Sequence, residues 1–313
     1  MRVLATGATG FVGRAVVRQL AADGHSVVGF ARTSRSCPCE LRTGDILDQA
    51  ALEDAMKGVD AVCHLAALTL VRRSFEEPVR YFRVNVGGTL NLLDAMKAEA
   101  QRSGRTLRLV FASTGAVYGA PDTQPISEAQ APAPGSPYSA SKLAAEAVIG
   151  YQAALGGISA VTLRTFNVAG AVDGYGDPDT SRIIPKALLV AAGQAECLSV
   201  NGDGSAVRDY THVGDLARAF GAALDSAGPA GHRVYNVGSG AGVSVREVIE
   251  AAERITGRPV PVRWGAPVNE PRELRADISR IRAELGWQPV MSGLETIVAD
   301  AWQALNGRRA GGM

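Results

Sequence analysis

The chain has 313 residues, of which 46% are hydrophobic, and its 32 Lys and Arg residues nearly balance its 31 Asp and Glu residues. This balance argues against a general nucleic-acid binder, which carries a basic excess, while only four cysteines and short apolar runs argue against a disulfide framework and a membrane helix of roughly 20 residues. Because Met1 leads directly into an apolar run and not into a signal peptide, we expect a cytoplasmic protein with no nucleic-acid or membrane partner.

Strands and helices alternate along the first half of the chain. Short apolar segments predict strands at 3–6, 26–31, 59–65, 107–112 and 159–164, and apolar residues at helical spacing predict helices at 11–20, 81–99 and 137–155. This alternation is typical of right-handed crossovers that build a parallel sheet with helices on both faces. The predicted fold class is therefore α/β, a Rossmann-type doubly wound parallel sheet.

The alternation weakens after Asn167. The segment 170–179 is rich in Gly and Asp and predicts a loop, followed by helices at 183–192, 243–255 and 278–285 and strands near 198–207 and at 233–237. We therefore divide the chain into a sheet domain over 1–170 and a smaller C-terminal lobe over 171–313, with a segment around 208–240 that can return to the sheet.

A glycine-rich turn joins the first predicted strand to the first helix. Its spacing is G-x-x-G-x-x-G, where a typical dinucleotide-binding turn has G-x-G-x-x-G. Glycines permit a tight turn and close backbone approach, and a helix N-terminus offers N–H groups to a pyrophosphate. We expect a dinucleotide to bind here, and the alternative is a turn without a ligand. The expected binding residues are Gly7, Thr9, Gly10, Phe11, Val12 and Gly13.

The end of the second predicted strand bears on which dinucleotide binds. An acid at this place normally binds the adenosine 2′-hydroxyl, but here Ala31 is followed by Arg32. A guanidinium pairs well with a 2′-phosphate, which favours NADP over NAD, unless Arg32 and Arg35 are solvated loop residues. Asp45 and Ile46, further along, are expected to contact the adenine.

Tyr138 and Lys142 lie four residues apart in a predicted helix and so share one helical face. A tyrosine that acts as a base needs a lowered pKa, and a nearby ammonium favours its phenolate. As an isolated match, however, the pair is common by chance.

Together with the glycine turn, the pair makes the sequence resemble the extended short-chain dehydrogenase/reductases of the NAD-dependent epimerase/dehydratase family, and most closely the UDP-glucose (UDP-galactose) 4-epimerase group. The resemblance covers nearly the whole chain. It rests on the segments 6–13, 64–67, 85–89, 112–119, 138–142, 163–167 and 208–213.

The resemblance implies a catalytic set. Thr114 would hydrogen-bond the sugar hydroxyl, Tyr138 would act as base and acid, and Lys142 would hold the nicotinamide ribose and lower the Tyr138 pKa. With Tyr138 and Lys142, the residues implied to line the cofactor are Leu65, Ala66, Ala67, Asn85, Ala112 and Phe166. The alternatives are a core aromatic for Phe166 and a helix-cap or turn residue for Asn85.

The C-terminal lobe would bind the substrate, a nucleotide sugar that the resemblance implies to be UDP-linked. Asn167 and Arg208 would contact its diphosphate, although Arg208 can also be a surface ion-pair residue. The family commonly has Arg-x-Gly-Asp where this chain has 267–271, so Arg182, Arg272 or Arg275 is needed as the second diphosphate arginine. Asn201 stands where an aromatic residue often lies near the uracil.

The implied reaction is 4-epimerisation. Tyr138 removes the C4 hydroxyl proton while hydride passes to the nicotinamide, the keto sugar turns over, and hydride returns to its other face. The alternatives left open are an NADP-dependent ketoreductase and a non-catalytic dinucleotide sensor. A dehydratase is disfavoured because Gly115 and Ala116 stand where the dehydratases have an acid pair.

Two further features bear on assembly and metals. The resemblance implies a homodimer through the helices around 82–98 and 140–155. Cys37-Pro38-Cys39 has no second cysteine pair or histidine at ligand spacing, so we expect a loop and no metal site.

Overall fold

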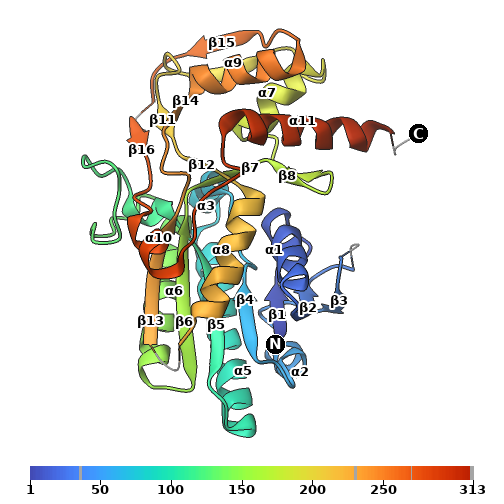
Figure 1. Cartoon of the computed structure of the whole chain (residues 1–313). Coiled ribbons are helices and arrows are strands. Elements are labelled where there is room, and N and C mark those ends of the chain that lie inside the picture. The colour runs from blue at the N-terminus through green and yellow to red at the C-terminus, as the bar shows by residue number, and fades with distance from the viewer. Residues whose placement is uncertain (35–36, 229–230, 269, 311–313) are drawn as a thin grey trace.

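The structure is a computed structural model that describes residues 1–34, 37–228, 231–268 and 270–310. All neighbouring strands of its main sheet run parallel. Their order is β13 (Gly231–Val237), β6 (Ile158–Thr165), β5 (Leu107–Thr114), β4 (Ala61–His64), β1 (Arg2–Thr6), β2 (Ser26–Ala31) and β3 (Glu40–Thr43) (Figure 1). The chain thus builds outward from β1 in both directions, and the predicted doubly wound α/β fold is confirmed.

Successive residues of the central strands face two separate cores. In β1, Val3 and Ala5 pack on one side of the sheet and Leu4 packs on the other. Helices α1 (Phe11–Ala22) and α8 (Val213–Ser226) cover the first side. The helices on the second side are α2 (Gln49–Met56), α5 (Gly88–Ser103) and α6 (Pro137–Ala154). Burial on both faces explains why these strands are continuously apolar.

Elements from beyond residue 170 complete this sheet. Strand β13 pairs with β6 along its whole length, from Gly231 opposite Ser159 to Val237 opposite Thr165. Helix α8 packs against α1, which comes from the first part of the chain. The boundary at residue 170 stays a prediction.

A second lobe lies beyond the carboxyl ends of the strands (Figure 1). Its core is formed by α7 (Ile183–Ala191), α9 (Val245–Thr256), α11 (Leu294–Ala310) and the paired strands β10 (Leu198–Asn201) and β15 (Val262–Gly265). Short strands connect the lobe to the sheet. They are β7 (Asn167–Ala169) with β12 (Tyr210–His212), β8 (Ala171–Val172) with β9 (Tyr175–Gly176), and β11 (Val207–Arg208) between β14 (Val243–Ser244) and β16 (Glu273–Leu274).

Some predicted elements differ from the structure. The helix predicted over 81–99 begins earlier, at Pro78, as α4 (Pro78–Phe82) and passes through a π-helical turn at Arg83–Gly87 before α5. The loop predicted over 170–179 contains the β8–β9 hairpin, whose turn includes Asp173 at a φ of 53°. The structure also contains helices and strands that were not predicted, among them β3, α2, α3 (Val71–Glu76), α8 and α11. Helix α10 (Ser279–Leu285) was predicted one residue longer, over 278–285.

None of the helices in the described ranges combines the length and the apolar character that crossing a bilayer requires.

Candidate active site

The glycine turn after β1 forms a tight backbone cradle. Gly7 has a φ of +71°, and a Cβ on it would lie 2.8 Å from the backbone nitrogen of Ala66. A Cβ on Gly13 would overlap the carbonyl oxygen of Gly7. Within the described chain no side chain caps α1 at Gly10, so backbone donors suited to a pyrophosphate remain at this helix end. Of the other predicted residues of this turn, Thr9, Phe11 and Val12 are half-buried and Gly10 is exposed.

The loop after β4 is fixed beside this turn. The hydroxyl oxygen of Thr6 accepts hydrogen bonds from the backbone N–H groups of Leu65 and Ala66, each at 3.2 Å. Leu65, Ala66 and Ala67 are half-buried. The structure therefore brings two predicted cofactor segments together, because β1 and β4 are neighbours in the sheet.

A buried histidine completes this connection. Thr89 donates its hydroxyl to the carbonyl of Asn85 at 2.7 Å, so its oxygen accepts from Nε2 of His64 at 3.1 Å. The Nδ1 atom of His64 then accepts from the hydroxyl of Thr6 at 2.7 Å. Burial, together with the charge of Lys142, lowers the pKa of His64 to about 3, which keeps the imidazole neutral as this network requires.

Asn85 lies in the π-helical turn and links that loop to α6. Its side-chain oxygen accepts from the N–H of Leu68 at 2.8 Å, and its side-chain nitrogen donates to the Leu68 carbonyl and to the Ser141 hydroxyl. These three hydrogen bonds occupy both the oxygen and the nitrogen of the Asn85 side-chain amide. Asn85 is therefore a positioning residue in this structure, and its direct contact with a cofactor stays a prediction.

Thr114 and Tyr138 meet at the carboxyl end of β5. The Thr114 side chain lies beside the Tyr138 phenol, where it favours the phenolate, and the Thr114 oxygen accepts a hydrogen bond from the N–H of Ala116 at 3.2 Å. Burial raises the pKa of Tyr138, and the nearby Thr114 side chain and the charge of Arg182 oppose this rise. The predicted effect of Lys142 on the Tyr138 pKa stays a prediction.

Lys142 is almost fully buried on the same face of α6, at 3% exposure. Its Nζ lies 4.1 Å from the centroid of the Phe111 ring, at cation–π distance. Burial lowers the pKa of Lys142 to about 7, and the charge of Glu146 opposes this shift. Lys142 is thus held at the sheet with a proton that it can lose near neutral pH.

A buried ion pair, which the sequence analysis did not predict, lies one helical turn beyond Lys142. Arg164 of β6 binds Glu146 through Nε and Nη2, the latter at 2.7 Å, and the Ser113 hydroxyl donates to the same carboxylate. The Nη1 atom of Arg164 donates to the Tyr118 hydroxyl at 3.0 Å, which donates onward to Asn236 at 2.8 Å. The available signal was the four-residue spacing from Lys142 to Glu146, one turn along the helix.

Two other predicted cofactor residues, Ala112 on β5 and Phe166 directly after β6, lie close to the end of β5. Ala112 is half-buried in β5. Phe166 packs on Gly115, since a Cβ there would lie 2.9 Å from the ring, and it joins a small apolar cluster with Val117 and Ile126. Its core role is therefore evident, and its contact with a nicotinamide stays a prediction.

The predicted adenosine-binding residues lie at the ends of β2 and β3. Arg32 is exposed directly after β2, while Arg35 lies outside the described residues. Asp45 accepts from the N–H of Leu47 at 2.9 Å and so shapes the turn after β3. Ile46 is buried against Gly88 at the start of α5.

The predicted substrate residues lie on the lobe side of the sheet. Two of the arginines among them form ion pairs, each with a different carboxylate. Arg208 forms an ion pair with Glu270 at 3.0 Å, and Arg182 forms one with Asp177, also at 3.0 Å. Arg272 is exposed, as is Asn167. The ion-pair alternative for Arg208 therefore describes this structure, and a diphosphate would have to displace Glu270.

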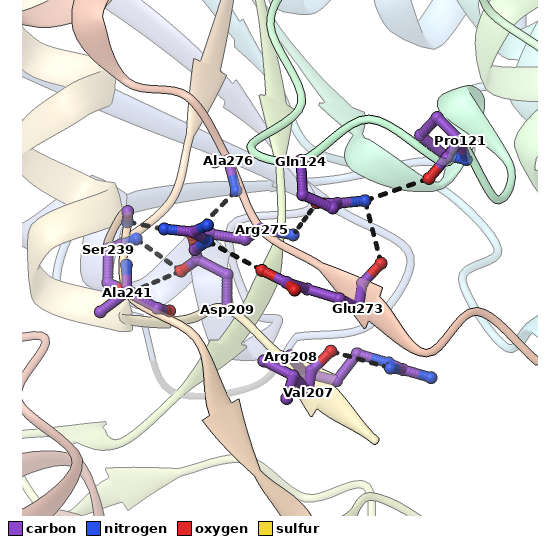
Figure 2. Close-up of polar contacts among 11 residues, drawn as sticks. Pro121, Gln124, Val207, Arg208, Asp209, Ser239, Ala241, Glu273, Arg275 and Ala276 are labelled. Carbon is purple, nitrogen blue, oxygen red and sulfur yellow. Dashed lines mark hydrogen bonds and ion pairs between the residues drawn. The ribbon is translucent and has the colours of Figure 1, made fainter. Parts of the chain in front are cut away.

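Asp209, next to Arg208, is a structural carboxylate that the sequence analysis did not single out. Figure 2 shows its side chain directed toward Ser239 and Ala276, away from that of Arg208. It accepts hydrogen bonds from Ser239 through both N–H and hydroxyl, and from the N–H groups of Gly240 and Ala276, at 2.6 to 3.1 Å. Burial raises its pKa, and these bonds oppose the rise. Asp209 thereby joins β11 to the segments after β13 and β16.

Among the described residues no cluster of three or more His, Cys, Asp or Glu side chains is arranged to hold a metal ion.

Comparisons with known proteins agree with this geometry. Residues 3–238 match the model of the family described as "NAD dependent epimerase/dehydratase family". A UDP-glucose 4-epimerase from Corynebacterium glutamicum is 39% identical over 96% of this chain and 95% of its own length.

Two solved structures resemble this chain in both fold and sequence. The UDP-glucose 4-epimerase from Brucella ovis in complex with NAD has a TM-score of 0.90 and 37% identity, covering 96% of this chain and 97% of that one. A UDP-glucose-4-epimerase from Stenotrophomonas maltophila with bound NAD and formylated UDP-arabinopyranose has a TM-score of 0.91 and 32% identity, covering 99% of each chain. The chain therefore belongs to the NAD-dependent epimerase/dehydratase family, as its sequence predicted.

Proposed function

We propose that the protein is a UDP-glucose 4-epimerase that works with a tightly bound NAD or NADP. The observation that carries the proposal is the placement of Thr114 beside Tyr138, one helical turn from the buried Lys142. These groups lie at the carboxyl ends of the strands, on the side where the glycine turn follows β1. The relatives above support the proposal, because they are UDP-glucose 4-epimerases and the two solved structures contain NAD.

The residues present fit a nicotinamide dinucleotide and a sugar hydroxyl. The turn at Gly7–Gly13 would hold the pyrophosphate, and Lys142 would hold the nicotinamide ribose. When bound, the nicotinamide accepts a hydride and can return it. Tyr138 takes and returns the proton of the sugar C4 hydroxyl, while Thr114 hydrogen-bonds both the phenol and that hydroxyl.

The test is turnover of UDP-galactose by the purified protein, with no nucleotide added. We expect UDP-glucose to form, because an epimerase regenerates its cofactor in each cycle. A ketoreductase would instead consume added NADPH in proportion to product, and a dinucleotide sensor would give no turnover. Either of those results would contradict the proposal.

The choice between NAD and NADP rests on Arg32. We propose that the pocket accepts NADP at least as well as NAD, because Ala31 removes the usual repelling acid and Arg32 is exposed beside it. A charge-assisted Arg–phosphate contact is worth about 1.5–3 kcal/mol. Arg32→Ala should therefore weaken NADP binding roughly tenfold or more and leave NAD binding unchanged, as titration of the cofactor-free protein would show. If the wild type bound NAD more tightly and the substitution left the affinity for NADP unchanged, Arg32 would have no role in choosing the cofactor.

A homodimer is part of the same proposal. Exposed apolar side chains lie on the helices named for it, including Leu90 of α5 at 43% exposure and Tyr151 of α6 at 78%. Placing Glu at both positions would put unpaired charges into a dimer interface, so we expect a monomer by light scattering. Val290→Glu, at a site that is 65% exposed outside these helices, is the matched control and should remain dimeric. A wild-type monomer would refute the dimer. The cytoplasmic location stays a prediction.

A further inference from the structure

Two cysteines lie together at the adenosine end of the predicted cofactor site. Cys37 and Cys39 flank Pro38 in the loop between β2 and β3, and their sulfur atoms are 3.1 Å apart. Both are free thiols, and both are half-buried. A disulfide would need only about 1 Å of further approach, to an S–S length near 2.05 Å.

The pair also touches the backbone that is predicted to hold the dinucleotide. The Cys37 sulfur lies 4.0 Å from the carbonyl oxygen of Ala8, within the glycine turn. A Cβ on Gly29 of β2 would lie 3.0 Å from the Cys39 sulfur and 2.9 Å from the Ala8 side chain. The two sulfurs therefore lie between β2 and the glycine turn, so we expect a change in their separation to shift that turn.

We propose that Cys37 and Cys39 form a reversible disulfide that weakens binding of the dinucleotide at the adjacent glycine turn. The effect on binding rests on the proposed function, whereas formation of the disulfide does not. The chemical class of oxidant is a low-molecular-weight disulfide.

The disulfide would form by two successive thiol–disulfide exchanges. The Cys37 thiolate attacks one sulfur of the small disulfide, which releases one small thiol and leaves a mixed disulfide on Cys37. The Cys39 sulfur then attacks Cys37, releasing the second small thiol, and the protons of both cysteines pass to the released thiols. Burial, followed by the contact with Cys37, raises the pKa of Cys39 to about 12, so Cys37 is assigned the first attack.

The first measurement locates the disulfide. The full-length protein is equilibrated in glutathione redox buffers, alkylated and digested, and the peptide that ends at Arg42 is weighed. We expect this peptide to lose two hydrogens under oxidising conditions while Cys63 and Cys197 remain alkylatable after unfolding. Cys37→Ser and Cys39→Ser should each abolish the change, and Cys197→Ser should not. Absence of the mass loss at every redox ratio would overturn the proposal.

The second measurement tests the coupling. The dissociation constant of NAD should rise at least about fivefold on oxidation, the lower end of ordinary coupling between sites. Because coupling is reciprocal, saturating NAD should make the disulfide harder to form by the same factor. An oxidised protein with an unchanged dissociation constant would overturn the coupling. If the reduced protein bound no NAD, the proposed function would fail while the disulfide result would stand on its own.

Discussion

Replacing Tyr138 by Phe is expected to lower kcat by roughly 10²- to 10⁴-fold, the usual contribution of a general acid–base group. The substitution removes only the hydroxyl that lies beside Thr114. The ring that fills the space beside Thr114 remains, so cofactor and substrate should bind nearly as in the wild type. Initial rates with UDP-galactose, together with the amount of dinucleotide that co-purifies, would measure both effects.

Thr114→Ser provides the matched control, because it retains the hydroxyl that contacts Tyr138. We expect this variant to lose far less activity than Tyr138→Phe. Near wild-type turnover of the Tyr138 variant would refute its assignment as the proton-transfer group. A large loss of bound cofactor would instead assign it a role in binding.

Replacing Arg164 by Ala is expected to destabilise the protein by about 3–5 kcal/mol, because it leaves a charged partner buried and unpaired. Glu146 is 4% exposed and Arg164 is 7% exposed, so water does not replace the lost guanidinium. The Tyr118 hydroxyl would lose a hydrogen-bond donor as well. The midpoint of urea unfolding, with the slope unchanged, would report the difference in the free energy of unfolding.

The double variant Glu146→Gln with Arg164→Met serves as the comparison. Removing both charges avoids the unpaired carboxylate, so this variant should be clearly more stable than Arg164→Ala. Equal stability of the two variants would show that lost packing, and not an uncompensated charge, sets the cost. The double variant should also lower the Lys142 pKa further, since Glu146 is the group that opposes its fall.

The sequence predicted the elements whose pattern is strong and local. The continuously apolar strands of the sheet were found because both of their faces are buried, and α1 and α6 were found because apolar residues recur at helical spacing. The short edge strand β3 carries no such pattern, since its residues are only half-buried or exposed. The π-helical turn at Arg83–Gly87 was missed because the spacing of apolar residues over a single turn does not distinguish i→i+5 from i→i+4 hydrogen bonding.

Only the local parts of the candidate site were predicted from the sequence. The glycine turn and the Tyr138–Lys142 pair were visible because each lies within one short segment. The links among them join residues far apart in the sequence, such as His64 with Thr6 and Thr89, or Glu146 with Arg164. Which acid pairs with Arg208 depends in turn on the path of the loop before β16, which no local pattern specifies.

The chain returns to the main sheet through β13, and this limits which fragments of the protein can fold. A fragment ending near residue 170 would leave β6 without the neighbour that pairs with it at seven successive positions. It would also lack α8, whose buried residues cover one face of the sheet beside α1. Such a fragment would present an unpaired strand edge and a bare apolar face, both of which promote aggregation. The segment 1–170 is therefore not expected to fold by itself, because the lobe is built from segments on both sides of β13, with α7 before it and α9 and α11 after it.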